Sequence, residues 1–336
     1  MSARISAIEY HLPASVLDNK QLSAEFPEWS VEKISAKTGI DRRHIASDSE
    51  FSSDLAIAAG RKVLESEGID PSAVEYLIVC TQSPDYYLPS TACIVQDALG
   101  IPTSAGATDI TLGCSGFVYA LGLAKGLIES GQVSTVLVIT ADTYSKFINP
   151  ADKSVRTIFG DGAAATLVTS DGSADALTAF TYGTDGAGAK SLIVPRGGLR
   201  DGVALQPKAD AAARRLEPSS HDLYMDGPDI FNFTLAVVPE SVEAILGKAG
   251  LEQDDIDLFV FHQANAFMLE HLRKKLNVPA EKFVVSLAET GNTVSSTIPI
   301  ALADAVRADV LRPGMKVMLL GFGVGLSWGG LVATWG

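Results

Sequence analysis

Asp109-Ile110-Thr111-Leu112-Gly113-Cys114-Ser115-Gly116-Phe117 is the stretch of this chain that most constrains its fold. The β-prone residues before it, and an alanine- and leucine-rich run to about Glu129 after it, place Cys114 at a turn from a strand to a helix. Gly113 and Gly116 allow a tight turn and leave room for a substrate. A thiol at a helix N-terminus meets free N–H groups and the positive end of the dipole, which favour the thiolate. The sequence therefore predicts that Cys114 is a nucleophile that becomes acylated.

The other two cysteines serve as an internal comparison. A free cysteine is usually a small buried hydrophobe. Cys80 ends the apolar run at 76–80, and Cys93 lies in the apolar run at 91–95, so we expect both in the core. Three cysteines in 336 residues do not make a disulfide framework, and this favours a cytoplasmic location.

Composition excludes several classes of protein. Hydrophobic residues make up 47% of the chain, enough for a large core and two structural halves. No apolar stretch follows the first four residues as in a secretory signal, and we expect no segment that crosses a membrane. The net charge of −14 disfavours nucleic acid as a partner, because such binders are generally basic.

An internal repeat organises the chain. Apolar runs in the first part recur, with similar flanking residues, in the second part. The matched pairs are 74–83 with 256–265, 136–139 with 317–320, and 162–168 with 329–334. Continuous apolar runs between helical segments imply strands that are covered on both faces. We therefore predict two similar α/β halves, 1–172 with the nucleophile and 173–336 with its partners.

The least repetitive segment, 183–227, is rich in glycine, alanine, arginine and aspartate and is broken by prolines. We interpret it as an excursion from the second half. It is either a solvated surface loop or a wall of the active site, since long loops in compact domains are often functional.

Two polar residues in the second half are candidate partners for the thiol. His262 follows an apolar strand, at the strand end that corresponds to Gln82 and Ser83 in the first half. Asn292 stands where the repeat places the counterpart of Cys114. Each has a structural alternative: a satisfied core histidine for one, a turn or helix-cap residue for the other. We expect the strand ends to converge on one site.

The glycine-rich run Gly321-Phe322-Gly323-Val324-Gly325 completes this pattern. It is not a dinucleotide fingerprint, because it leads into another strand. Its glycines allow the backbone to approach a ligand closely, with N–H groups available to an oxyanion. We expect no metal site, since His262 has no further ligand at suitable spacing.

Together these motifs resemble the β-ketoacyl-acyl carrier protein synthase III family of the thiolase superfamily. The resemblance rests on 109–117, Phe159-Gly160-Asp161-Gly162-Ala163, His262-Gln263-Ala264-Asn265, Gly291-Asn292-Thr293 and 321–329, and it covers essentially the whole chain. It implies a five-layered αβαβα thiolase fold with two pseudo-symmetric halves, and a homodimer.

The resemblance also implies a mechanism with no cofactor. Cys114 takes an acyl group from a coenzyme A thioester, and a malonyl thioester follows, usually on acyl carrier protein but alternatively on coenzyme A. His262 and Asn292 stabilise the enolate formed by loss of carbon dioxide. Backbone N–H groups of Cys114 and Val324 hold the tetrahedral oxyanion, although the family usually has glycine at the position of Val324.

Further residues take roles through the same resemblance. Leu88 is expected to cross the dimer interface and close the partner's acyl pocket. The substrate-binding residues implied are Leu88, Phe159, Met225, Gly227, Phe322, Lys37 and Lys153. The carrier-docking residues are Arg273, Lys274 and Lys275, for which a solvated helix face is the alternative.

The carrier-binding positions depart from the family. Lys33 and Lys153 stand where a tryptophan and an arginine usually stack on adenine, and Trp29 could substitute only if its loop moved. Lys37 replaces an arginine that contacts phosphate. The docking arginine and lysine are replaced by Phe267 and Asn232.

Two other functions compete with condensation. One is an acyltransferase of the same superfamily that passes the acyl group to an alcohol or amine without decarboxylation. Asn292 disfavours it, because an asparagine has no acid–base capacity. The other is a non-catalytic partner in a condensing heterodimer, which the retained Cys114 disfavours.

Overall fold

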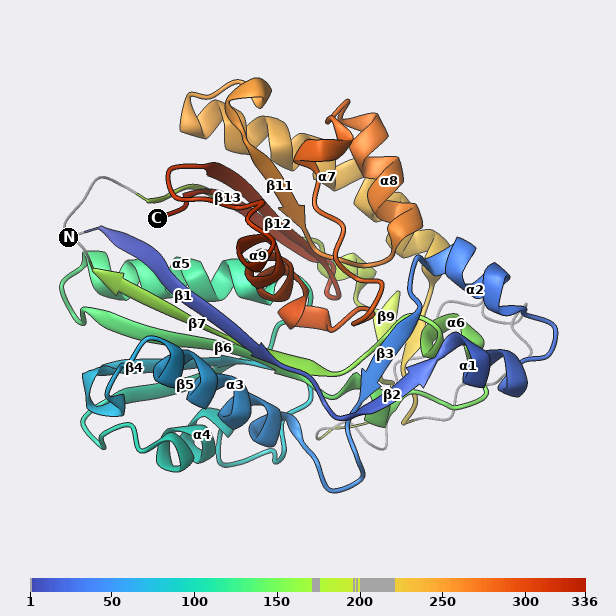
Figure 1. Cartoon of the computed structure of the whole chain (residues 1–336), viewed down its shortest axis with the longest axis horizontal. Coiled ribbons are helices and arrows are strands. Elements are labelled where there is room, and N and C mark those ends of the chain that lie inside the picture. The colour runs from blue at the N-terminus through green and yellow to red at the C-terminus, as the bar shows by residue number, and fades with distance from the viewer. Residues whose placement is uncertain (1, 171–175, 196, 198, 200–220) are drawn as a thin grey trace.

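Two β-sheets form the frame of the molecule (Figure 1). The structure is a computed structural model that describes residues 2–170, 176–195, 197, 199 and 221–336. The first sheet contains, in spatial order, β1 (Ala3–His11), β7 (Gly162–Ser170), β6 (Thr135–Asp142), β4 (Tyr76–Cys80) and β5 (Gly106–Ile110). The second contains β8 (Leu177–Thr184), β13 (Ser327–Thr334), β12 (Lys316–Gly323) and β11 (Leu258–Phe261).

The two sheets repeat one another in strand order and direction. In each, two antiparallel pairings are followed by a parallel one: β1, β7, β6 and β4 correspond to β8, β13, β12 and β11. The counterpart of β5 is reduced to a single parallel bridge between Phe259 and Phe283. This order confirms the predicted pseudo-symmetry. The boundary placed between 172 and 173 lies outside the described residues, so the division into 1–172 and 173–336 stays a prediction.

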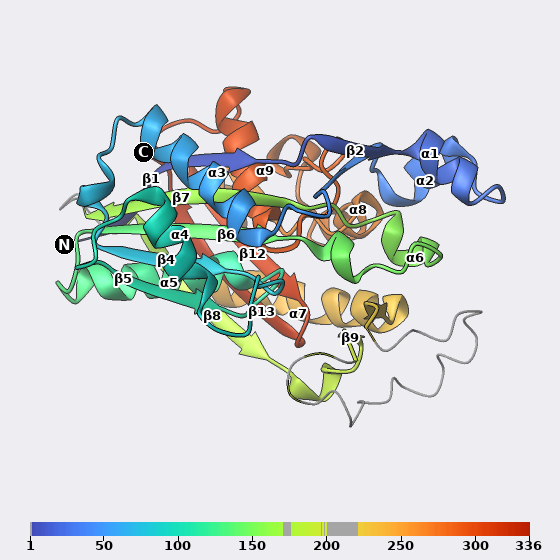
Figure 2. The same ribbon diagram turned by 90° about the horizontal axis from the view of Figure 1, so that it is seen from below.

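Helices separate and cover the sheets, which gives five layers (Figures 1 and 2). The helices are α3 (Ser52–Ser66), α4 (Thr91–Leu99), α5 (Gly116–Glu129), α7 (Gly227–Ala249), α8 (Ala266–Lys275) and α9 (Thr297–Arg307). The pair α5 and α9 lies between the sheets, and its buried residues share one core with strands of both. Helices α3 and α4 cover the outer face of the first sheet, and α7 and α8 cover that of the second. The predicted α/β thiolase architecture is therefore confirmed.

Buried polar contacts join the two halves close to the carboxyl ends of the strands. Ser115 and Ser327 hydroxyls lie 2.7 Å apart, and those of Thr140 and Ser296 lie 2.9 Å apart. The Ser295 hydroxyl donates to the Asp142 carboxylate. Because buried hydroxyls are costly without partners, these pairs fix the halves in one register.

Smaller elements gather at one end of the layers, on the right of Figure 1. They are β2 (Ser15–Asp18), α1 (Asn19–Glu25), α2 (Val31–Thr38), β3 (Arg42–Ile45), α6 (Lys153–Arg156), β9 (Leu192–Ile193) and β10 (Tyr224–Met225). Strands β9 and β10 belong to the excursion, which begins at the end of β8 and leads into α7. Residues 196, 198 and 200–220 of the excursion lie outside the described residues.

One expectation from the sequence needs correction. Cys93 is exposed, because α4 turns Thr91, Ala92, Val95 and Leu99 inward and Cys93 to the other side. Helix α7 is long and apolar enough to cross a membrane by length and composition alone, a test that core helices of other proteins also pass. In this fold α7 lies on the second sheet, with Val238, Val242 and Ile245 buried against it.

Candidate active site

Cys114 lies in the turn between β5 and α5, as the sequence predicts, and is only 5% exposed. The Gly116 amide donates to the Gly113 carbonyl at 2.8 Å and closes the turn. The end of β12 passes directly over the thiol: a Cβ added to Gly323 would lie 2.8 Å from the sulfur. A Cβ on Gly116 would lie 2.3 Å from the Cys80 sulfur. Both positions therefore require glycine for steric reasons.

The sulfur is held as a neutral thiol. Burial raises the pKa of Cys114 to about 12, and the charge of Asp142 adds to the effect. Backbone hydrogen bonds from Val324 and from Cys114 itself lower the pKa, but by less. The thiolate expected from the helix N-terminus is thus not the resting form, because desolvation outweighs the local N–H groups. A base must accept the thiol proton when the sulfur reacts.

His262 follows β11 and is buried. Its backbone amide donates to the Leu320 carbonyl, and its ring meets the edge of Phe322 with 5.6 Å between centroids. Burial lowers the pKa of His262 to about 3, so the ring is neutral at physiological pH. The alternative reading of His262 as a core histidine with satisfied hydrogen bonds does not hold for both ring nitrogens. Only one of them has a protein partner among the described residues.

Thr297 at the start of α9 is that partner and fixes the proton on the ring. Its hydroxyl lies 2.7 Å from Nδ1 of His262 and donates to the Val294 carbonyl at 3.1 Å. A hydroxyl has a single hydrogen, so it accepts the Nδ1–H. We therefore assign the neutral tautomer in which Nε2 carries the free lone pair.

Asn292 is oriented by the turn in which it lies. Its Oδ1 accepts the Val294 amide at 2.9 Å, while Nδ2 is 3.4 Å from the Ala264 carbonyl. Its backbone pairs with Phe159, which packs in the same buried cluster as Cys114 and Val294. Because Nδ2 donates one hydrogen to the Ala264 carbonyl, the side chain has its second N–H to offer to a ligand.

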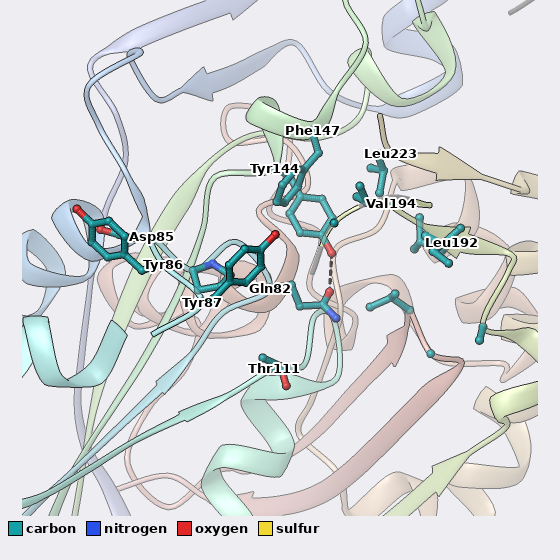
Figure 3. Close-up of a pocket in the computed structure, with 16 residues that line it drawn as sticks. Gln82, Asp85, Tyr86, Tyr87, Thr111, Tyr144, Phe147, Leu192, Val194 and Leu223 are labelled. Atoms are coloured by element: carbon teal, nitrogen blue, oxygen red, sulfur yellow. Dashed lines mark hydrogen bonds between the residues drawn. The ribbon is translucent and has the colours of Figure 1, made fainter. Parts of the chain in front are cut away.

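A cavity of about 880 Å³ opens beside the buried cluster that contains Cys114 (Figure 3). Its wall includes Val324 and three members of the buried cluster around Cys114, namely Tyr144, Leu192 and Leu223. Residues 189, 192–194 and 197 of the excursion also line it. The described part of the excursion is thus a wall of this cavity rather than a solvated loop.

The remaining residues expected to bind substrate differ in their burial and in their distance from the cluster around Cys114. Phe159 and Phe322 are buried, and Met225 packs against the cluster around Cys114. Gly227 is the first residue of α7, with open space where a Cβ would lie. Leu88 is 83% exposed and is not part of the cavity wall of its own chain.

A lysine cluster from α2 and α6 surrounds Trp29, at the end of the layers where the smaller elements gather. The amines of Lys33, Lys37 and Lys153 each lie 5.5 Å from the centroid of its ring. Lys153 also pairs with Glu28. Trp29 thus lies beside Lys33 and Lys153, and its use as a stacking surface for adenine stays a prediction.

The basic residues of α8 are partly neutralised. Arg273 forms two hydrogen bonds of 2.8 Å with Glu270, and Lys274 lies 3.2 Å from the same carboxylate. Lys275 donates to the Leu235 carbonyl at 2.7 Å. Beside them, Phe267 is 53% exposed and stacks with Phe231 at 5.8 Å. The docking role of these three basic residues stays a prediction.

The sequence reasoning missed the polar residues that support the site. Gln82, Asp142 and Tyr144 follow or end strands of the first sheet, and Thr297 begins a central helix. Asp142 accepts the Gln82 amide at 2.9 Å and the Ser295 hydroxyl. Their place at strand ends facing the repeat partner was a signal that could have found them.

Comparison with known proteins identifies the class. Residues 108–186 match the family described as 3-oxoacyl-[acyl-carrier-protein] synthase III, and residues 246–335 match its C-terminal domain. The chain is 38% identical over 336 residues to the beta-ketoacyl-[acyl-carrier-protein] synthase III of Syntrophomonas wolfei, covering 100% of this chain and 98% of that protein.

Solved structures agree. A 3-oxoacyl-(acyl-carrier-protein) synthase III crystal structure shares 48% identity with a TM-score of 0.94, and all of both chains is covered. The priming beta-ketosynthase from the R1128 polyketide biosynthetic pathway shares 30% identity with a TM-score of 0.87, covering 99% of this chain and 96% of that one. The chain belongs to the β-ketoacyl-acyl carrier protein synthase III family. It is an acyl-transferring condensing enzyme.

Proposed function

We propose that this enzyme forms a β-ketoacyl thioester in two steps, with Cys114, His262 and Asn292 as its catalytic residues. The single observation that carries the proposal is the setting of Cys114. Its sulfur is buried beside an acyl-sized cavity, receives backbone N–H groups from Val324 and Cys114, and lies against Gly323. The same N–H groups suit the oxyanion of a tetrahedral intermediate at this carbon.

In the first step, the sulfur attacks the carbonyl of an acyl-coenzyme A, and the bond from that carbonyl to the coenzyme A sulfur breaks. Because the thiol has a pKa of about 12, the proton must move as the bond forms. Nε2 of neutral His262 accepts it and passes it to the departing coenzyme A thiolate. The acyl chain occupies the cavity lined by Leu192 and Leu223.

In the second step, a malonyl thioester, carried by acyl carrier protein, loses carbon dioxide. The electron pair of the broken carbon–carbon bond forms an enolate, whose oxygen takes hydrogen bonds from Asn292 Nδ2 and His262 Nε2. The carbanion attacks the acyl carbonyl, the bond from that carbonyl to the Cys114 sulfur breaks, and the departing thiolate takes a proton from solvent. For His262 to donate from Nε2, the ring gains a proton there from solvent and loses its Nδ1 proton to solvent, and the Thr297 hydroxyl turns from the Val294 carbonyl to Nδ1.

The binding sites for the carriers belong to the same proposal. Trp29 with Lys33, Lys37 and Lys153 forms a platform for the adenine and phosphates of coenzyme A. The enzyme works as a homodimer in the cytoplasm, without a cofactor, and the exposed Leu88 closes the partner's cavity. Arg273, Lys274 and Lys275, next to exposed Phe267, contact the carrier protein.

Two variants test the division of labour. Cys114→Ser should abolish self-acylation by acyl-coenzyme A and leave the fold intact, because a hydroxyl is far less ionised than a thiol. Asn292→Ala should acylate normally but lose malonyl decarboxylation. Mass spectrometry of the acyl-enzyme and measurement of released carbon dioxide separate the two steps. Acylation of the Ser variant at the wild-type rate would refute the assignment of the nucleophile.

Condensation is favoured over the two competing functions. The relatives and structures reported above are condensing synthases. An asparagine at 292, with its Oδ1 already bound by Val294, cannot act as a base for an alcohol or amine acceptor.

A further inference from the structure

One pair of polar side chains interrupts the apolar part of the cavity wall. Gln82 follows β4, and its backbone amide is anchored on Asp142 at 2.9 Å. Its side-chain Oε1 lies 2.5 Å from the hydroxyl of Tyr144 (Figure 3). A Cβ added to Gly113 would lie 2.4 Å from the same Oε1. The amide of Gln82 therefore lies against the residue that precedes the nucleophile.

The roles within this pair follow from the environment of Tyr144. The ring is buried and packs on Phe147 and Phe159, with centroids 6.0 and 5.4 Å away. Burial raises the pKa of Tyr144 well above its usual value, so the hydroxyl keeps its hydrogen. It donates this hydrogen to Oε1 of Gln82, which fixes the orientation of the amide.

Gln82 lines the cavity, and its Nε2 keeps two hydrogens that the bond to Tyr144 does not use. Figure 3 shows this nitrogen on the side of the amide away from Tyr144. No described residue accepts a hydrogen bond from it. A ligand without an acceptor would strip water from this donor and leave it unpaired, whereas a matching oxygen would satisfy it.

We propose that the acyl primer of this enzyme carries a neutral oxygen, either keto or hydroxyl, on one of the first carbons beyond the thioester carbonyl, and that Gln82 Nε2 binds it. The position follows from the contact of the amide with Gly113. A neutral oxygen is preferred over a carboxylate because Asp85 also lines the cavity. This inference rests on the proposed function, since it names the acyl group that reaches Cys114.

The test is a competition between acyl groups of equal length. The enzyme is mixed with equimolar butyryl-coenzyme A and either acetoacetyl- or 3-hydroxybutyryl-coenzyme A, and the adducts on Cys114 are counted by mass spectrometry at early times. The wild-type enzyme should favour each oxygenated group at least tenfold, as expected of a site built to hydrogen-bond its substrate.

Variants test whether Gln82 and Tyr144 cause the preference for oxygenated acyl groups. Gln82→Leu should bring the ratio close to one, and Tyr144→Phe, which keeps the ring, should reduce it severalfold by freeing the amide to rotate. Thr111→Val is the matched control: it removes another hydroxyl from the same cavity and should keep the wild-type ratio.

The possible results distinguish failure of this inference from failure of the proposed condensing function. A wild-type ratio near one, or a ratio unchanged in both Gln82→Leu and Tyr144→Phe, overturns the inference and leaves the condensing function standing. Preference for the hydroxyl but not the keto group also overturns it, because Nε2 would then not be the recognising atom. Absence of any adduct from all three thioesters refutes the proposed function itself.

Discussion

Gly323→Ala should damage the nucleophile without touching any polar group. The added Cβ would lie 2.8 Å from both Cβ and Sγ of Cys114. Carbon contacts are comfortable at about 3.5–4.0 Å, so the strand or the thiol must move by roughly 1 Å. Overpacking of this kind costs about 1–3 kcal/mol of folding stability. A displacement of about 1 Å at a reacting atom costs on the order of 100-fold in rate.

The assay is the single-turnover rate of Cys114 acylation by an acyl-coenzyme A, with denaturant unfolding measured alongside. Gly247→Ala is the matched control, since it adds the same methyl group to an exposed site in α7 where a Cβ meets nothing within 4 Å. That control should acylate normally and gain up to about 1 kcal/mol of stability. A Gly323→Ala variant that acylates at the wild-type rate would refute the placement of β12 over the thiol.

Three further predictions concern the supporting residues. Thr297→Val should slow acylation more than decarboxylation, because Nδ1 of His262 loses its acceptor and the proton moves to Nε2; Thr297→Ser should restore both rates, and equal losses in the two steps would contradict the tautomer. Asp142 has its pKa raised to about 7 by burial, so the folded chain binds this proton more tightly than the unfolded chain. The free energy of unfolding should therefore be highest near pH 4 and fall as the pH rises to 7, by at most about 4 kcal/mol from this group. Denaturant titrations at several pH values should show that the free energy of unfolding of Asp142→Asn depends less on pH. Asp161, whose pKa is also raised by burial, should leave some of this dependence. Trp29→Ala should raise KM for acyl-coenzyme A about tenfold at similar kcat, consistent with the loss of base stacking; a pantetheine thioester without the nucleotide should show no change.

The fold could be predicted from the sequence because the repeated segments are continuous apolar runs. The runs at 74–83 and 256–265 became β4 and β11, each parallel to a strand of its own sheet. A run buried on both faces has little alternative to the centre of such a sheet. Cys93 was misplaced because its apolar neighbours hid the helical period that turns it outward.

The candidate site was less predictable because its chemistry depends on contacts across the two halves. Nothing local in the sequence shows that desolvation overrides the helix N-terminus at Cys114, or that a threonine from α9 sets the tautomer of His262. The pair of Gln82 and Tyr144 joins positions 62 residues apart in the sequence. Such pairs appear only when the sheets and the central helices are in place.

The fate of the acyl group on Cys114 tests the proposed mechanism most directly. The decisive measurement loads the enzyme with a labelled acyl group, maps it to the Cys114 peptide, and adds a malonyl thioester labelled in its free carboxyl group. We expect one labelled carbon dioxide for each acyl group that leaves Cys114, and that acyl group recovered in a β-ketoacyl thioester. Transfer of the acyl group to an alcohol or amine without release of carbon dioxide would contradict the account.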